Sequence, residues 1–126
     1  MELGVVGIGR MGANISRRLM RDEHRCVVFD LDPAAVERLT SEGAVGAASL
    51  EELAAALAPP RIVWVMVPAG EATEAVIREL ADRLQPGDIV IDGGNTHYRD
   101  DVRRADELAE RGIRYVDCGT SGGVHG

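Results

Sequence analysis

The sequence contains no lysine: all 14 basic residues are arginine, and 21 acidic residues set the net charge at −7. That sign of charge disfavours binding to nucleic acid or to an anionic membrane surface. Aromatic residues make up only 3% of the chain, too few for a platform that stacks single-stranded bases. An acidic chain can still bind phosphate locally, because backbone amides at a helix N-terminus need no basic side chain.

Long apolar segments are lacking as well. No stretch approaches the roughly 18 apolar residues of a membrane span, and the N-terminus has no basic signal-peptide segment. The only cysteines, Cys26 and Cys118, lie far apart in apolar, strand-like runs. We therefore expect reduced thiols in a cytoplasmic protein and no metal site, the alternative being a metal or redox role.

What is present is a regular alternation of apolar strands and amphipathic helices along 126 residues. Strands are expected at 3–9, 26–30, near 45, 61–67, 89–92 and 113–118, with a helix between each consecutive pair. The connections are short, which favours right-handed crossovers onto one parallel sheet. We predict one α/β domain over residues 1–126, a doubly wound parallel six-stranded sheet with strand order 3-2-1-4-5-6.

Two details of burial follow from the pattern. The six apolar residues after Arg61 predict a strand buried on both faces. Met11, Ile15 and Leu19 recur at spacing four, which predicts the apolar stripe of the first helix.

The segment from Gly7 to Gly12, GIGRMG, has the GxGxxG pattern. An apolar strand precedes it, an amphipathic helix follows, and Asp30 ends the next strand, so the context is that of a dinucleotide-binding Rossmann fold. Gly7 permits the tight turn, Gly9 lets the backbone approach a pyrophosphate, and Gly12 allows close helix packing. Arg10 and Met11 complete the predicted cofactor loop. The alternative is a structural turn without a ligand.

Asp30 lies 18 residues after Gly12, where such folds place the residue that hydrogen-bonds the adenosine ribose. A carboxylate there accepts hydrogen bonds from the ribose 2′- and 3′-hydroxyls and repels a 2′-phosphate. Leu31 offers that phosphate no positive charge. We therefore expect NAD to be preferred, with NADP possible if Arg10 or Arg25 points into the site.

The ends of the fourth and fifth strands carry further candidates. Val67, Pro68 and Ala69 are expected to flank the nicotinamide ribose. The Asn95 amide both donates and accepts, so it can bridge a carboxamide and a substrate hydroxyl, the alternative being a cap of the next helix. His97 is a catalytic candidate or a solvated side chain, and no role is assigned to His125.

Four segments occur in order and closely resemble the N-terminal domain of 6-phosphogluconate dehydrogenase: GVVGIGRMGANISRRL, VWVMVPAG, DGGNTHYRDD and YVDCGTSGG. The resemblance to this member of the β-hydroxyacid dehydrogenase superfamily spans essentially the whole chain. GTSGGV and Asp30 look most like its shorter, NAD-preferring members. The resemblance implies that Asn95 contacts both substrate and nicotinamide. It also implies that Ser121, Gly122 and Gly123 hold the carboxylate end of the sugar acid.

The family oxidises the C3 hydroxyl of 6-phosphogluconate by hydride transfer to nicotinamide, and the β-keto acid then loses CO2 to give ribulose 5-phosphate. This chemistry needs a general base and a general acid. The family supplies them as a lysine and a glutamate from helices downstream of the SGG loop. The resemblance thus implies that no catalytic residue lies in this chain, that the family's helical C-terminal domain lies beyond Gly126, and that the chain binds NAD without turnover. His125 departs from the family pattern.

Two other functions remain open. One is another enzyme of the superfamily, of the 3-hydroxyisobutyrate or tartronate semialdehyde type, although DGGN argues against it. The other is a nucleotide-binding module outside catalysis, natural or engineered. For such a free-standing module we expect an exposed apolar face, where the family's helical domain would pack, that favours self-association.

Overall fold

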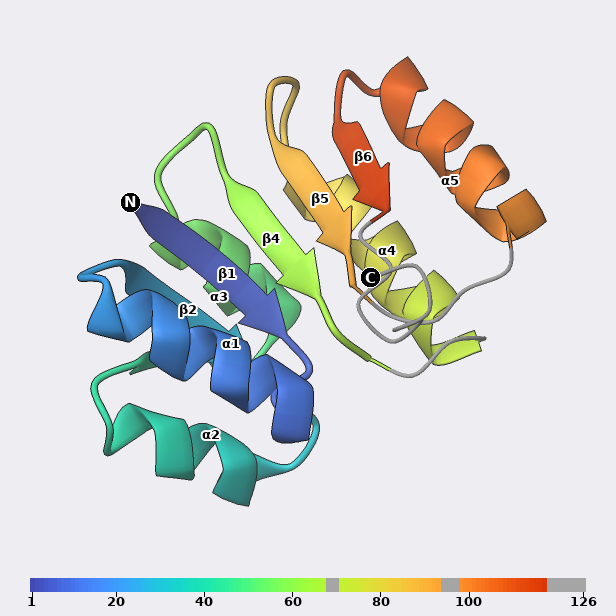
Figure 1. The fold of residues 1–126 in the computed structure, drawn as a ribbon. Helices are drawn as coiled ribbons and strands as arrows, with labels where there is room; N and C mark the ends of the chain where they lie inside the picture. The colour runs from blue at the N-terminus through green and yellow to red at the C-terminus, as the bar shows by residue number, and fades with distance from the viewer. Residues whose placement is uncertain (68–70, 94–97, 118–126) are drawn as a thin grey trace.

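The computed structural model describes residues 1–67, 71–93 and 98–117, which form a twisted parallel sheet with helices on its faces (Figure 1). The sheet has the order β3-β2-β1-β4-β5-β6, as predicted. Its strands are β1 (Glu2–Val6), β2 (Arg25–Phe29), β3 (Val45–Gly46), β4 (Ile62–Val65), β5 (Ile89–Asp92) and β6 (Arg114–Asp117). The helices between them are α1 (Arg10–Arg21), α2 (Pro33–Thr40), α3 (Leu50–Ala56), α4 (Glu71–Arg83) and α5 (Tyr98–Glu110).

The helix starts follow from the side chains that precede them. Asp32 caps α2 by accepting a hydrogen bond from the backbone N–H of Ala34 at 3.1 Å. Ser49 caps α3 by accepting from the N–H of Glu52, also at 3.1 Å. Each cap satisfies an N–H group that the helix itself cannot pair. Aspartate and serine are among the residues that favour the N-cap position, so the sequence around each helix start accounts for both caps.

The helices divide between the two faces of the sheet. In Figure 1, α1 and α2 lie in front of β1 and β2, whereas α3 and α4 lie behind the sheet. The buried residues accordingly form two clusters. The front cluster joins α1 and α2 to the sheet and includes Val5, Val28 and Leu39. The rear cluster extends from α3 to β6 and includes Leu53, Leu80 and Ile113.

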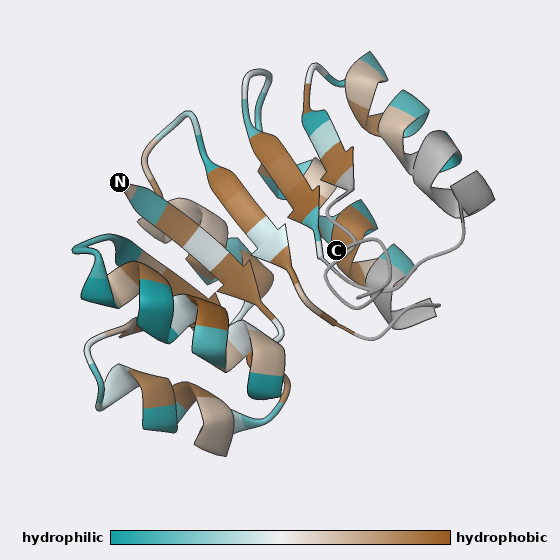
Figure 2. Cartoon of the chain, in the orientation of Figure 1, coloured by the Kyte–Doolittle hydropathy of each residue, from teal (hydrophilic) through white to brown (hydrophobic). Residues whose placement is uncertain are grey.

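Burial on the front face falls from one side of the sheet to the other. The strand register aligns five residues in one row: Val28, Val5, Trp64, Ile91 and Val116. Val28 and Val5 are 0% exposed, Trp64 and Ile91 are partly buried, and Val116 is 38% exposed. Among the described residues, no helix lies in front of the second half of this row, and the ribbon of β4 to β6 carries the brown of hydrophobic residues over part of each strand (Figure 2).

This gradient corrects the prediction that the strand after Arg61 is buried on both faces. In β4 only Val63 and Val65 are fully buried, and the alternate residues Ile62 and Trp64 are only partly buried. The rear face of β4 packs on the core shared with α3 and α4. Its front face has no helix among the described residues, so the apolar run is fully buried on its rear face and only partly buried on its front face.

The predicted apolar stripe of α1 is confirmed only in part, since Leu19 packs against the front cluster but Met11 does not. The buried residues of α1 are Gly12, Ala13 and Ser16, whereas Met11 is 46% exposed. A Cβ at Gly12 would clash with the carbonyl oxygen of Gly7, so α1 approaches the end of β1 too closely for a larger side chain. Close backbone approach at Gly12 therefore determines the buried face at the start of this helix, and Leu19 and Met20 pack on the front cluster further along it.

Candidate functional site

The carboxyl ends of β1 and β4 meet where the strand order reverses, which is the position expected for a ligand. Gly7 follows β1 with φ +89°. A Cβ at Gly7 would lie 2.9 Å from the backbone N of Val67 and 3.0 Å from its Cγ1. The structure thus brings Gly7 and Val67, predicted separately from two motifs, into contact at one edge of the sheet.

The glycine-rich loop leads directly into α1. Gly9 is the N-cap residue of that helix, so no side chain caps the helix start. A Cβ at Gly9 would have no heavy atom within 4 Å, so the loop faces open space at this point. Arg10 and Met11, the next two residues, are both exposed. This geometry leaves room for a group that approaches the start of α1.

The charges of α1 match an anion at its N-terminus. No acidic residue lies in its first turn, while Arg18 and Arg21 lie in its last turn. The unpaired amides at a helix start carry partial positive charge, so a phosphate is stabilised there. Arginines near the other end interact favourably with the opposite end of the helix dipole.

Asp30 lies directly after β2, beside the same loop. Its Oδ2 accepts a hydrogen bond from the N–H of Ile8 at 2.7 Å, and its Oδ1 accepts from the N–H of Asp32 at 2.9 Å. Leu31, between the two aspartates, is 90% exposed. The residue predicted to bind the ribose, Asp30, therefore lies beside the loop predicted to bind the pyrophosphate and is joined to it by a hydrogen bond.

Arg25 does not belong to this site. It begins β2, whereas Asp30 follows the other end of that strand. Arg25 pairs with Glu2 and donates to the carbonyl of Ala56 at 3.3 Å. Of the two arginines considered for a 2′-phosphate, only Arg10 lies at the carboxyl edge of the sheet.

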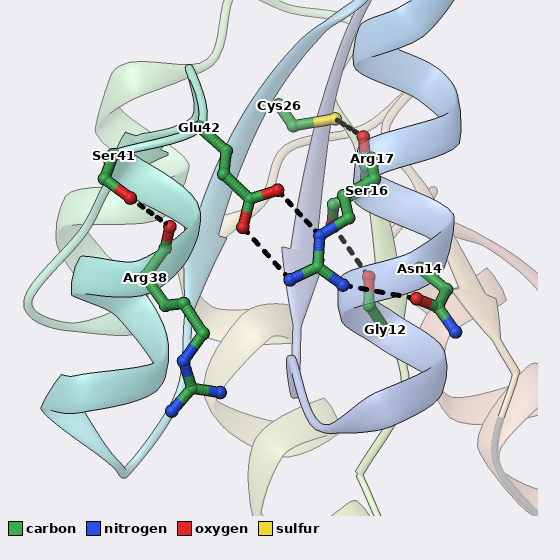
Figure 3. Close-up of polar contacts among 8 residues, drawn as sticks. All are labelled: Gly12, Asn14, Ser16, Arg17, Cys26, Arg38, Ser41 and Glu42. Atoms are coloured by element: carbon green, nitrogen blue, oxygen red, sulfur yellow. Dashed lines mark hydrogen bonds and ion pairs between the residues drawn. The ribbon is translucent and has the colours of Figure 1, made fainter.

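Polar side chains of α1 make contacts within the helix and with the turn after α2 (Figure 3). Arg17 donates to both carboxylate oxygens of Glu42, at 2.8 and 3.0 Å. This pairing lowers the pKa of Glu42 and raises the pKa of Arg17, mainly through the side-chain hydrogen bonds. The Ser16 hydroxyl donates to the carbonyl of Gly12 at 2.8 Å. The helix start is thus held by contacts made further along the helix.

Cys26 packs beneath α1 and is 1% exposed. Its thiol lies 3.8 Å from the carbonyl oxygen of Ser16, and burial raises its pKa. A buried thiol with a raised pKa is a poor nucleophile, because the reactive species is the thiolate. The structure therefore supports the expectation that Cys26 is a core thiol. In the described ranges, no group of three or more His, Cys, Asp or Glu residues could hold a metal ion.

Asp92, in the DGGN segment, is a buried residue for which the sequence pattern indicates no role. It ends β5, is 0% exposed, and accepts a hydrogen bond from the Tyr115 hydroxyl at 2.6 Å. Alternation along the strand places it on the rear face with Val90. The signal was present in the sequence as a carboxylate that ends an apolar run, but its tyrosine partner is on another strand.

Trp64 and Gly93 form a second contact that the sequence did not indicate. A Cβ at Gly93 would clash with the Trp64 indole nitrogen and with the sulfur of Met66. The indole N–H is buried and makes no hydrogen bond to any residue that the structure describes. Gly93 is thus required for the close approach of the chain after β5 to the aromatic ring on β4.

Several predicted site residues lie outside the described residues: Pro68, Ala69, Asn95, Ser121, Gly122 and Gly123, and so do the catalytic candidate His97, the second cysteine Cys118, and His125. Their predicted roles stay predictions. The adenosine half of the predicted site lies within the described residues, whereas most of the nicotinamide and substrate half does not.

The family of the chain follows from comparison with known proteins. The model of the NAD-binding domain of 6-phosphogluconate dehydrogenase matches residues 2–126. The chain belongs to this family. Its fold and its adjacent glycine-rich loop and carboxylate agree with that membership. Among the helices of the described ranges, none has the length and apolar character needed to cross a membrane.

Similar proteins are longer than this chain. YqeC of Bacillus subtilis is 44% identical over 126 residues, all of this chain and 42% of that protein. An NAD-dependent decarboxylating 6-phosphogluconate dehydrogenase of Haloferax volcanii is 42% identical over the whole chain and 41% of its own length. An NADP-dependent decarboxylating enzyme of B. subtilis is 39% identical over 99% of this chain and 28% of its own length. The chain thus spans about two fifths or less of these relatives.

Solved structures agree with the fold. The 6-phosphogluconate dehydrogenase of Plasmodium falciparum superposes with a TM-score of 0.81 at 28% identity, over 91% of this chain and 26% of that one. The 3-hydroxyisobutyrate dehydrogenase of Mycobacterium tuberculosis superposes at 0.84 over 92% of this chain and 39% of that one. At 23% identity, the second match supports the fold alone.

Proposed function

We propose that this NAD-binding domain prefers NAD to NADP and belongs to an enzyme that oxidatively decarboxylates 6-phosphogluconate. The observation that carries the cofactor preference is the position of Asp30, bonded to the glycine-rich loop at 2.7 Å. A carboxylate there accepts from both ribose hydroxyls and repels a 2′-phosphate. Leu31, 90% exposed, adds no positive charge.

Relatives of both cofactor types match this chain, so the preference depends on its own residues. Arg10, unlike Arg25, lies at the carboxyl edge of the sheet, where it is exposed at the start of α1. Arg10 could attract a 2′-phosphate, but the negative charge of Asp30 repels it. A carboxylate held by two backbone N–H groups does not turn away from an incoming phosphate at low cost.

The substrate proposal rests on the names of the relatives, several of which are decarboxylating 6-phosphogluconate dehydrogenases. Asn95 is proposed to bridge substrate and nicotinamide, and Ser121, Gly122 and Gly123 to hold the sugar-acid carboxylate. Hydride transfer from C3 requires a base for the hydroxyl proton. The family base is a lysine, and this chain contains none. We therefore propose that the 126-residue chain binds NAD without turning over 6-phosphogluconate.

Calorimetric titration of the purified chain with NAD, and separately with NADP, tests the cofactor preference. We expect NAD to bind at least about tenfold more tightly, because one repelled 2′-phosphate readily outweighs 1.4 kcal/mol. Equal or tighter binding of NADP would overturn it. Steady NADH formation from 6-phosphogluconate by this chain would overturn the proposed lack of turnover.

The partly exposed front face of β4 to β6 supports a further proposal, weak self-association with a second copy of the chain. The face presents the apolar residues Ile62, Trp64, Ile91 and Val116. The first three are partly buried and Val116 is exposed. Removing such surface from water is favourable. Sedimentation at increasing protein concentration should show a growing mean mass, and a constant monomer mass at the highest concentration would contradict the proposal.

A further inference from the structure

The Asp30 carboxylate is in contact with the chain on both of its oxygens. Oδ2 accepts from the N–H of Ile8 at 2.7 Å, and Oδ1 accepts from the N–H of Asp32 at 2.9 Å. Both are short hydrogen bonds to an ionised acceptor, the stronger class of such bonds. The residue proposed to recognise the cofactor therefore also accepts two hydrogen bonds from the backbone of the chain.

The bond from Ile8 matters because this residue lies inside the glycine-rich loop, between Gly7 and Gly9. The loop leaves β1 with the Gly7 N–H bonded to the carbonyl of Phe29 at 2.9 Å. One residue later, the Ile8 N–H turns to the Asp30 carboxylate, and the Ile8 side chain is buried at 3% exposed. The end of β2 thus determines the path of the loop by two successive hydrogen bonds.

A carboxylate can perform both tasks at once. Its two oxygens offer about four acceptor positions. The two backbone N–H groups occupy one position on each oxygen. One position on each oxygen remains, which matches the two hydroxyls of a ribose. A carboxamide cannot reproduce this arrangement, because its nitrogen would place N–H groups against one of the two backbone N–H donors.

We propose that Asp30 is a positioning residue for the glycine-rich loop, so that pyrophosphate binding and the choice between NAD and NADP are coupled through one carboxylate. This inference rests on the proposed cofactor function, and it adds that Asp30 acts on the phosphates without contacting them. A change at Asp30 that removes the repulsion of a 2′-phosphate also loosens the loop that binds the pyrophosphate.

The test separates the ribose contact from the loop contact by the choice of probe. ADP has both ribose hydroxyls, whereas 2′,3′-dideoxy-ADP has neither, so Asp30 can affect its binding only through the loop or through its charge, and removal of that charge alone would strengthen the binding of an anion. In Asp30→Asn we expect the affinity for dideoxy-ADP to fall roughly fivefold to tenfold, the scale of one lost hydrogen bond to a charged group. The affinity for ADP should fall further.

Asp32→Asn is the matched control. It removes the same charge two residues away, and asparagine still caps α2 in place of the Asp32 side chain that accepts from Ala34. Both probes should bind this variant within about twofold of the parent chain. Asp30→Glu keeps a carboxylate with two acceptor oxygens and should retain most of the dideoxy-ADP affinity. It also provides the measurement if Asp30→Asn fails to fold.

A ligand-free measurement completes the test. Amide hydrogen exchange of Ile8 should accelerate at least about tenfold in Asp30→Asn and remain slow in Asp32→Asn, because exchange requires the bond to open. Unchanged dideoxy-ADP affinity or unchanged Ile8 exchange in Asp30→Asn overturns the inference and leaves the proposed function intact. If the parent chain binds neither NAD nor ADP, the proposed function fails, and the Ile8 exchange still decides the positioning role.

Discussion

The two halves of the sheet are built from similar apolar strands but are covered differently. In β1 and β2, four and three consecutive residues are fully buried, because helices pack on both faces. In β4 and β5, buried and partly buried residues alternate, because the described helices cover only the rear face. An apolar run therefore indicates a strand, but the number of its buried faces depends on elements elsewhere in the fold.

The covered half depends most on the contact between α1 and β1, and Gly12→Ala should break it. The new Cβ would clash with the Gly7 carbonyl, a backbone atom that cannot rotate away. We expect a loss of about 3 kcal/mol in unfolding free energy, measured by urea denaturation.

Gly9→Ala is the matched control for that variant. Its Cβ has no neighbour within 4 Å, so the stability should change by less than about 1 kcal/mol. NAD affinity should nevertheless fall, because the methyl group occupies the space through which the pyrophosphate approaches. Equal destabilisation by the two variants would contradict the close packing of α1.

The same substitution at two ends of the front row compares the halves directly. Val28→Thr places a hydroxyl at a site that is 0% exposed, and we expect it to cost about 1–3 kcal/mol. Val116→Thr, at 38% exposed, should change stability by less than about 0.5 kcal/mol. Unfolding at low and high protein concentration measures both. An equal cost at Val116 would show that the second half is covered in solution.

On the rear face, the second half of the sheet is buried like the first. Tyr115→Phe tests a buried contact of this second half. The variant removes the 2.6 Å hydrogen bond to Asp92, whose carboxylate is 0% exposed. We expect a loss of about 1–2 kcal/mol. A double-mutant cycle with Asp92→Leu, which has no acceptor, isolates the pair, and a coupling below about 0.5 kcal/mol would argue against the bond.

The smallest expected effect concerns the ion pair between α1 and the turn after α2. The pKa of Glu42 is lowered in the folded state by Arg17, so the pair stabilises the fold above the ordinary glutamate pKa. That contribution is lost as the pH falls through the lowered folded value. Glu42→Gln should make the denaturation midpoint less dependent on pH in the acidic range.

High salt provides the control for that experiment, because screening weakens a partly exposed pair. In about 1 M salt the parent chain and Glu42→Gln should show similar acid dependence. A difference that persists at high salt would mean that Glu42 acts through something other than its pairing with Arg17.

Much of the adenosine half of the site could be predicted from the sequence. GxGxxG between a strand and a helix, followed by Asp30 at the end of the next strand, places these residues at one edge of a parallel sheet. The bond between Asp30 and Ile8 could not be predicted, because spacing gives the neighbourhood of two residues but not the direction of an N–H. The partner of Asp92 was missed for a similar reason, since it lies 23 residues away on another strand.

The sequence by itself determined the order of strands and helices, the capping residues and the glycine-rich loop, because these depend on hydrogen bonding and periodicity within short segments. Only the tertiary structure decided that Gly12 rather than Met11 faces the sheet and that Val28 is buried while Val116, in the same row, is exposed. Burial is a relation between distant segments. A residue's own neighbours in the chain determine which way it points, and the rest of the fold determines whether anything covers it.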